Sequence, residues 1–397
     1  MSQDPGRILT THVGSLIRPD DFAAMIRAQM HGEPVDQASF DARLKSAVLE
    51  VTRQQAEAGL DIINDGEFGK TISWADYLVE RVGGIVQEPP STVDFTSSPA
   101  LYSQDMKDFA DFYAGYFATQ EMDIDKMVGW VVREPLRYTG QAAINRDIAD
   151  LKAALNGVEH VDAFMPSVAP GSALQARRDE YYKSEEDYLQ AIAEVLREEY
   201  RAIVDAGFIV QVDDAYLATT YDVMVPGKSL EDYRRWAGLR VEALNHALEG
   251  IPIERTRYHV CWGSWNGPHV TDVELKHIVD LILQVRVGGY ALEMANPRHE
   301  HEWRVWENVK LPEGRKLIPG VISHSTNVVE HPELVAERLT RLARLVGREN
   351  VVGGTDCGFA QTPYLQRVHP TIQWAKLKAL AEGARLAARE LWGKDAA

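Results

Sequence analysis

The feature of this chain that most constrains its fold is a regular alternation of short apolar runs with long amphipathic segments. The runs resemble buried strands, and most are followed by apolar residues at the three- and four-residue spacing of a helix. The eight runs predicted as strands are residues 8–15, 61–67, 160–167, 208–214, 258–263, 290–296, 317–324 and 350–357. The segments predicted as helices include residues 41–58, 185–206, 230–248, 273–287, 332–346 and 372–391.

Strands separated by helices are usually parallel, because each helix returns the chain to the starting edge of the sheet. Eight such units predict an α/β fold, a (β/α)8 TIM barrel in which residues 1–397 form one catalytic domain. A doubly wound open sheet is the alternative. The barrel is favoured because no Gly-rich phosphate loop follows any predicted strand.

The interval between the second and third predicted strands is too long for a single crossover helix. We predict that residues 68–159 contain a helical, aromatic-rich insertion with a small hairpin near residues 131–143. An insertion after the carboxyl end of a barrel strand faces the catalytic side, so we expect a lid or a surface for homo-oligomer formation. The alternative is that its aromatic residues only form a small core of their own.

The charge and cysteine content of the chain bear on its partners and location. A net charge of −17 without any Lys/Arg cluster argues against binding to nucleic acid or to anionic membranes. No apolar run reaches about 18 residues, so we expect no membrane span, and residues 1–7 lack the pattern of a secretion signal. Two cysteines in so long a chain are typical of a reducing compartment, and we expect a cytoplasmic protein.

Both cysteines lie at the ends of predicted strands. His259 and Cys261 are two residues apart, so their side chains point to the same face of a strand and can reach one ion. Cys357 ends the eighth predicted strand, and the carboxyl ends of all barrel strands meet at one rim. Thiolate and imidazole are the ligands that zinc prefers, so we predict a zinc site here. A disulfide between Cys261 and Cys357 is the alternative.

The ligand set indicates a class of chemistry. Two bound thiolates make zinc electron-rich and a poorer Lewis acid for water than an all-histidine site. Such a site is better suited to holding a third thiolate, from a substrate, in reactive form at neutral pH. The two cysteines therefore favour alkylation of sulfur over hydrolysis.

Other polar residues are predicted at the same rim. They are Gly14 and Ser15 at the end of the first strand, with Arg18 after it, Glu67 at the end of the second, Asp213 at the fourth, Glu293 at the sixth, with Arg298 after it, and His324 at the seventh. Glu293 is the candidate fourth zinc ligand, and otherwise a carboxylate beside the metal or the substrate. Arg18 and Arg298 are candidates for binding an anionic substrate tail, although a surface salt bridge is an equal alternative for each.

Several polar residues have a structural interpretation as well as a functional one. Glu67 and Asp213 are candidates for catalysis, but both could be buried partners of loop amides. His12 is expected to be a hydrogen-bonded core histidine. His299 and His301 do not fit a His-Glu-x-x-His metal motif, and we expect them to begin a solvated helix.

These motifs resemble the catalytic barrel of the cobalamin-independent methionine synthase superfamily. The resemblance implies zinc binding by His259, Cys261, Glu293 and Cys357, and a proton donor at His324. It also implies that Gly14-Ser15, Gly66-Glu67 and Gln211-Val212-Asp213 hold an amino acid thiol. Within the superfamily, the strings CWGSWNGPHVTD, PRHEHEWRVWE and HSTNVVEHPELVAER look most like epoxyalkane:coenzyme M transferase.

The chain also departs from the methionine synthases. Asp213 is followed by Asp214-Ala215 rather than Glu-Pro, Cys261 is followed by Trp-Gly-Ser-Trp, and the folate-binding N-terminal half of those enzymes is missing from the sequence. These differences argue against homocysteine and a polyglutamated folate as the substrates.

We therefore predict a zinc-dependent transferase that joins a small thiol to a small alkyl electrophile. The first hypothesis is opening of an epoxide by a coenzyme M-like thiol, with His324 protonating the alkoxide. The alternative is methyl transfer, from a methyltetrahydrofolate-type or other donor, to homocysteine or a related thiol. A zinc-stabilised barrel without turnover is a second alternative. The identity of the thiol, the donor and the oligomeric state are left open.

Overall fold

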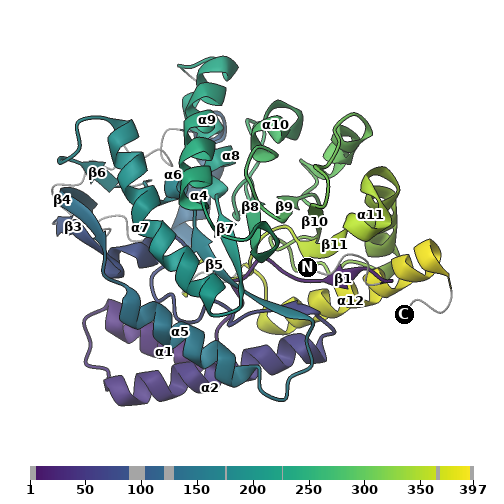
Figure 1. Ribbon diagram of the computed structural model, residues 1–397, viewed down its shortest axis with the longest axis horizontal. Coiled ribbons are helices and arrows are strands. Elements are labelled where there is room, and N and C mark those ends of the chain that lie inside the picture. The colour runs from purple at the N-terminus through teal and green to yellow at the C-terminus, as the bar shows by residue number, and fades with distance from the viewer. Residues whose placement is uncertain are drawn as a thin grey trace.

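Eight parallel strands form a nearly closed barrel in the computed structural model, which describes residues 6–88, 103–119, 129–174, 177–225, 227–363 and 367–393. The strands are β1 (Leu9–Thr10), β2 (Ile62–Ile63), β5 (Asp162–Val168), β7 (Ile209–Asp213), β8 (Thr256–Val260), β9 (Gly289–Glu293), β10 (Lys316–Ile322) and β11 (Val352–Thr355). Their order is β1-β11-β10-β9-β8-β7-β5-β2 (Figure 1). The ring closes where Asp61 N donates to Thr10 O at 3.1 Å. The predicted barrel and all eight predicted strands are confirmed.

The barrel interior is filled with side chains rather than open. One apolar residue from each of seven strands contributes to a buried cluster: Leu9, Ile62, Phe164, Ile209, Ala291, Ile318 and Val352. The eighth strand, β8, contributes Arg257, whose guanidinium lies 3.5 Å from the centroid of the Phe164 ring. The polar residues that follow the strands are therefore left at the carboxyl-end rim, as in other barrels of this type.

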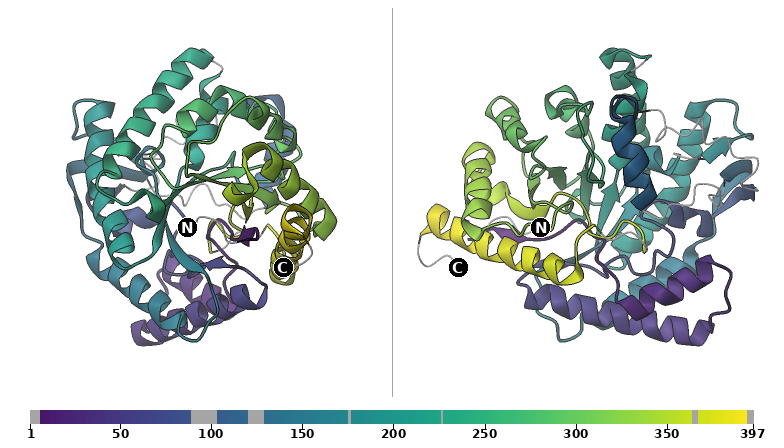
Figure 2. Two further views of the ribbon diagram at one scale, coloured as in Figure 1. Left: turned by 45° about the vertical axis from the view of Figure 1, so that its right-hand side comes forward. Right: turned by 180° about the vertical axis from the view of Figure 1, so that it is seen from behind.

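Helices cover the outside of the barrel (Figures 1 and 2). They are α1 (Asp20–Met30), α2 (Gln37–Glu57), α5 (Gln141–Ala154), α6 (Pro170–Ala173), α7 (Glu185–Asp205), α8 (Ala215–Met224), α9 (Leu230–Ala247), α11 (Pro332–Val346) and α12 (Pro370–Trp392). Local sequence explains where they begin: Ser229 and Asp232 form a capping box at the start of α9. Among the described residues, no helix is both long and apolar enough to cross a membrane.

The long helix predicted over residues 273–287 is wrong. The structure has only a 3-10 turn, Leu275–His277, and the short α10 (Val279–Ile282). A tertiary contact takes a backbone group that the helix would use, because Trp262 Nε1 donates to Val273 O at 2.6 Å. His277 N, which would donate to that carbonyl in an α-helix, donates to Glu274 O instead. The next crossover is also a 3-10 segment, Glu300–Glu307.

A small three-stranded sheet lies outside the barrel beside α7 (Figure 1). It consists of β3 (Val82–Glu88), β4 (Gly129–Tyr138) and β6 (Arg177–Asp179), with β3 antiparallel to β4 and β6 parallel to β4. The hairpin expected near residues 131–143 is therefore wrong: β4 pairs with β3, which ends at Glu88, and α5 begins at Gln141.

Residues 68–159, which were expected to form an insertion, also contain one of the helices of the barrel itself. Helix α5 packs against α2 and α7 in the outer layer, so it is the helix between the second and third barrel strands. The added elements are β3, β4, the 3-10 turn Asp76–Glu80, α3 (Gln104–Asp108) and α4 (Ala110–Thr119). Asp105 in α3 accepts hydrogen bonds from Val270 N and Thr271 N at 2.9 Å each, which ties this region to the loop after β8. Its role as a lid or dimer surface stays a prediction.

Glu199 in α7 connects the small sheet to the barrel. Its buried carboxylate accepts hydrogen bonds from Tyr77 Oη at 2.6 Å, Tyr138 Oη at 2.7 Å and Ser167 Oγ at 2.8 Å. It also pairs with Arg81 at 3.2 Å. The four partners come from the 3-10 turn after β2, from β4, from β5 and from the residue before β3, so one carboxylate holds several elements together.

Replacing Glu199 with glutamine is expected to lower the free energy of unfolding by roughly 3–5 kcal/mol, because it removes one partner of a buried ion pair. The glutamine amide group would also place N–H donors against hydroxyl groups that donate to the carboxylate in the wild-type protein. Chemical denaturation would measure the loss. Glu198→Gln, one residue earlier on the exposed side of α7, is the matched control and should change stability by less than about 0.5 kcal/mol. Equal effects of the two substitutions would contradict this account.

Candidate metal centre and its cavity

His259, Cys261 and Cys357 converge at the rim of the barrel. Their ligand atoms all lie within 4.8 Å of one another, and all three residues are buried. His259 is the penultimate residue of β8, Cys261 follows that strand, and Cys357 lies two residues beyond β11. The two sulfur atoms are 3.6 Å apart and both cysteines are free thiols, so the structure does not contain the alternative disulfide.

Hydrogen bonds make this cluster a proton-sharing group. Cys261 donates to Cys357, which holds the pKa of Cys357 well below its ordinary value and raises the pKa of Cys261. Burial lowers the pKa of His259, but hydrogen bonds to Asp213 and Cys357 outweigh it and raise that pKa to about 10. The cluster thus holds protons where a metal cation would displace them.

Asp213 orients the imidazole. Its Oδ1 atom lies 3.0 Å from His259 Nδ1 and accepts a hydrogen bond from Gln211 Nε2 at 2.7 Å. A carboxylate on one ring nitrogen leaves the other for a metal, which is the common arrangement at metal-binding histidines.

Glu293 lies beside the cluster but outside the group of three. Its Oε2 atom accepts a hydrogen bond from Trp262 N and its Oε1 atom from Asn296 Nδ2, both at 2.9 Å. The carboxylate is therefore engaged with the loops after β8 and β9. Its role as a fourth ligand stays a prediction.

A cavity of about 160 Å³ adjoins the cluster. Its lining combines the three cluster residues, two carboxylates and several aromatic rings: Val13, Ser15, Glu67, Trp74, Asp213, Ala215, Tyr216, Thr219, His259, Cys261, Gly263, Ser264, Trp265, Cys357, Gly358 and Gln361. The volume is small beside the roughly 300–1,000 Å³ of pockets for drug-sized ligands. Small substrates fit it best.

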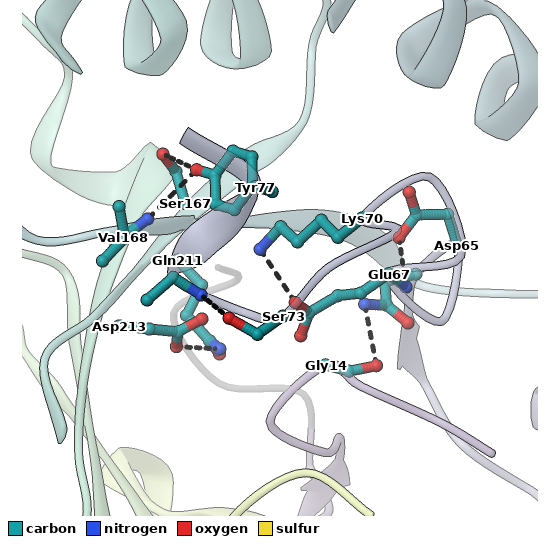
Figure 3. A network of polar contacts seen from close by, with 12 residues as sticks. Gly14, Asp65, Glu67, Lys70, Ser73, Tyr77, Ser167, Val168, Gln211 and Asp213 are labelled. Atoms are coloured by element: carbon teal, nitrogen blue, oxygen red, sulfur yellow. Dashed lines mark hydrogen bonds and ion pairs between the residues drawn. The ribbon is translucent and has the colours of Figure 1, made fainter. Parts of the chain in front are cut away.

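Glu67 is presented to this cavity by a strained loop (Figure 3). Its backbone has a φ of 61°, in the left-handed region that residues other than glycine rarely adopt. Asp65 Oδ1 accepts a hydrogen bond from Glu67 N at 2.9 Å, and Lys70 Nζ lies 2.8 Å from Glu67 Oε2. Burial raises the pKa of Glu67 to about 7. A Cβ atom at Gly14 would collide with Glu67 Oε1, so the close approach requires glycine there.

The two arginines predicted to bind a substrate tail do not line the cavity. Arg18 is buried and donates to the carbonyl oxygens of Glu67 and Lys70, at 2.7 Å each, so it clamps the loop. Arg298 is exposed and donates to Val270 O at 2.7 Å. Ser15, in contrast, does line the cavity.

The predicted proton donor, His324, lies just beyond β10 and is buried. Among the described residues, neither of its ring nitrogens has a hydrogen-bond partner, and burial lowers its pKa. It does not line the cavity described above, so its role in proton transfer stays a prediction. His12, expected to be a core histidine, is one: its Nε2 atom lies 2.8 Å from Gln55 Oε1.

A second buried polar group supports the loop after β8, and the sequence reasoning missed it. His299 is buried, not solvated as expected, and contacts Asp272 and Glu302 at 2.9 Å each. Asp272 also contacts His269 at 2.8 Å, and the His269 ring stacks on Trp265 with centroids 4.6 Å apart. The three-residue spacing of these His and acid pairs was the signal available in the sequence.

Comparison with known proteins gives one consistent result. Residues 103–376 match the family described as "Cobalamin-independent synthase, Catalytic domain". The 2-hydroxypropyl-CoM lyase of Xanthobacter autotrophicus is 26% identical, over 97% of this chain and 96% of that protein. The methionine synthase of Sulfolobus acidocaldarius is 23% identical, over 91% and 89%. A B12-independent methionine synthase from Shewanella sp. W3-18-1 shares the fold, with a TM-score of 0.70 at 20% identity, over 97% of this chain and 99% of that one.

Proposed function

The chain belongs to the family of the cobalamin-independent synthase catalytic domain, and from that premise we propose that it transfers a methyl or alkyl group to a small thiol carrying an ammonium group. The proposal rests on one observation: the cluster of His259, Cys261 and Cys357 shares its cavity with the carboxylates of Glu67 and Asp213. The cluster suits a sulfur atom, and the carboxylates suit a cation on the same molecule. The relatives named methionine synthase support methyl as the transferred group.

The donor set fits zinc, which prefers thiolate and imidazole. His259, Cys261 and Cys357 would hold the ion, with Glu293 as the proposed fourth ligand. When bound, zinc would supply a Lewis acid that keeps a substrate thiol deprotonated at neutral pH.

The residues of the chain would position the thiol for transfer. Glu67 and Asp213 would accept hydrogen bonds from the ammonium group, and Ser15 could donate to a further polar group of the substrate. The rings of Trp74 and Trp265 would limit access of water. In the transfer itself, a sulfur–carbon bond forms while the bond from that carbon to its leaving group breaks, and the leaving group departs with the electron pair.

A coenzyme M-like thiol attacking an epoxide is the second candidate, and one observation favours it: similarity to 2-hydroxypropyl-CoM lyase extends over nearly the whole chain. His324 would then protonate the alkoxide. The cavity offers less support, because among its described lining residues there is no lysine or arginine to meet a sulfonate. We therefore rank the ammonium-bearing thiol first. A barrel with only a structural zinc is the third candidate.

Calorimetric titration of the zinc-loaded protein would separate these candidates. Homocysteine should bind at least about tenfold more tightly than 4-mercaptobutanoate, which lacks only the amino group, because a charge-assisted hydrogen bond contributes roughly 1.5–3 kcal/mol. Both thiols should release a proton, counted from titrations in two buffers with different ionisation enthalpies. Tight binding of coenzyme M instead would favour the epoxide reaction. If no thiol gives a binding signal, only the candidate with a structural zinc would remain.

A further inference from the structure

Lys70 is a buried cation that contacts the candidate substrate-binding carboxylate from outside the cavity. Its Nζ atom lies 2.8 Å from Glu67 Oε2, and 6% of the residue is exposed. Lys70 does not line the cavity of about 160 Å³, whereas Glu67 does. Both residues line a separate void of about 10 Å³, so Glu67 lines both spaces and Lys70 only the smaller one. Figure 3 shows the contact between Lys70 Nζ and the Glu67 carboxylate.

The other charges around Glu67 make this contact important. Asp65 and Asp213 both disfavour ionisation of Glu67, as burial does, and Lys70 opposes them. Arg18 interacts electrostatically with Glu67, but it donates its hydrogen bonds to backbone carbonyl oxygens and not to the Glu67 carboxylate. Among the described residues, Lys70 is the one cation that donates to the Glu67 carboxylate.

More distant charges belong to the same surroundings. Asp147 raises the pKa of Asp65 and Arg81 lowers it. Asp147 and Arg81 also form an ion pair with each other at 2.5 Å. The Tyr77 ring lies below Lys70, with Nζ 4.6 Å from its centroid, and stabilises the ammonium group in place. Lys70 is therefore held on two sides, by a ring and by a carboxylate.

We propose that Lys70 is a positioning residue that keeps Glu67 ionised and fixes its orientation, and that it thereby sets the preference for a thiol with an ammonium group. The inference rests on the proposed function. An ionised carboxylate holds an ammonium group by charge and hydrogen bonding, whereas a protonated one loses the charge and part of its acceptor capacity. Burial without a cation would favour the protonated form.

The affinity ratio of homocysteine to 4-mercaptobutanoate isolates this effect, because deprotonation of the thiol is common to both. In the wild-type protein the ratio should rise as the pH increases through about 7, the pKa of Glu67. Lys70→Met should move that midpoint upward, because a neighbouring opposite charge lowers a carboxyl pKa by about 1–3 units. Near pH 7 the ratio should then fall about tenfold or more.

Two further variants control the experiment. Lys70→Arg keeps a cation and should restore most of the ratio. Lys316→Met removes a buried lysine that contacts Glu349 O at the start of β10, at the opposite end of the barrel from the rim, and should leave the ratio unchanged. Melting temperature and zinc content of each variant report whether it folds.

The possible outcomes distinguish failure of the role proposed for Lys70 from failure of the proposed ammonium site. If the wild-type protein does not prefer homocysteine, the proposed ammonium site is wrong. If the wild-type protein does prefer it, and folded, zinc-loaded Lys70→Met keeps the same ratio and the same midpoint, then the role of Lys70 alone is overturned. A lowered ratio that Lys70→Arg fails to restore would also count against the charge of Lys70 as the cause.

Discussion

Cys357→Ser should purify with less than about a tenth of the wild-type zinc and should no longer bind thiols with proton release. The substitution replaces a soft ligand with a hydroxyl that stays protonated at neutral pH. It also removes one of the two sulfur atoms that lie 3.6 Å apart, leaving a donor set of one thiol and one imidazole. Metal analysis after gel filtration measures the first effect, and calorimetry measures the second.

The cysteine variant needs a control substitution at another buried position, because Cys357 is buried. Thr340→Val is a suitable comparison: it changes a buried hydroxyl in α11 that has no hydrogen-bond partner among the described residues, so zinc content should not change. Cys261→Ser should behave like Cys357→Ser, since both sulfur atoms belong to one cluster. Full zinc occupancy with unchanged thiol binding in either cysteine variant would overturn the ligand assignment.

Glu67→Gln is expected to have the second large effect, a loss of about tenfold to a hundredfold in homocysteine affinity near pH 8. The amide has nearly the shape of the carboxylate but no charge, so affinity for 4-mercaptobutanoate should change little. Calorimetry of the zinc-loaded variant with both thiols measures the difference. Equal losses for the two thiols would mean that Glu67 supports the fold of the cavity rather than the ammonium group.

The same variant tests the pH dependence with a definite sign. Burial raises the pKa of Glu67 from its ordinary value of 4.5 to about 7. Binding that needs the ionised form is therefore present above about pH 7 and is lost as the pH falls through that value. The wild-type ratio of homocysteine to 4-mercaptobutanoate affinity should follow this curve, whereas the ratio in Glu67→Gln should be flat. A sloping ratio in the variant would assign the titration to another group.

The barrel could be predicted from the sequence because its pattern is local. Each strand is a short apolar run, and most of the long crossover helices have apolar residues at helical spacing, as in α7 and α11. Where tertiary contacts replaced local ones, the prediction failed. Residues 273–287 have an apolar pattern, but Trp262 occupies the carbonyl oxygen of Val273, which a helix would have used. The partner of β4 was missed for a related reason, since β3 lies far away in the sequence.

The sequence by itself determined which residues could meet at the candidate metal centre. The two-residue spacing of His259 and Cys261, and the position of Cys357 after the last strand, place all three on one rim once the chain closes into a barrel. Only the tertiary structure decided which charges line the cavity. It turned Arg18 onto two carbonyl oxygens and brought Lys70 to Glu67. Spacing fixes the side of a strand on which a residue lies, whereas the partner of a long charged side chain in a loop depends on the packing around it.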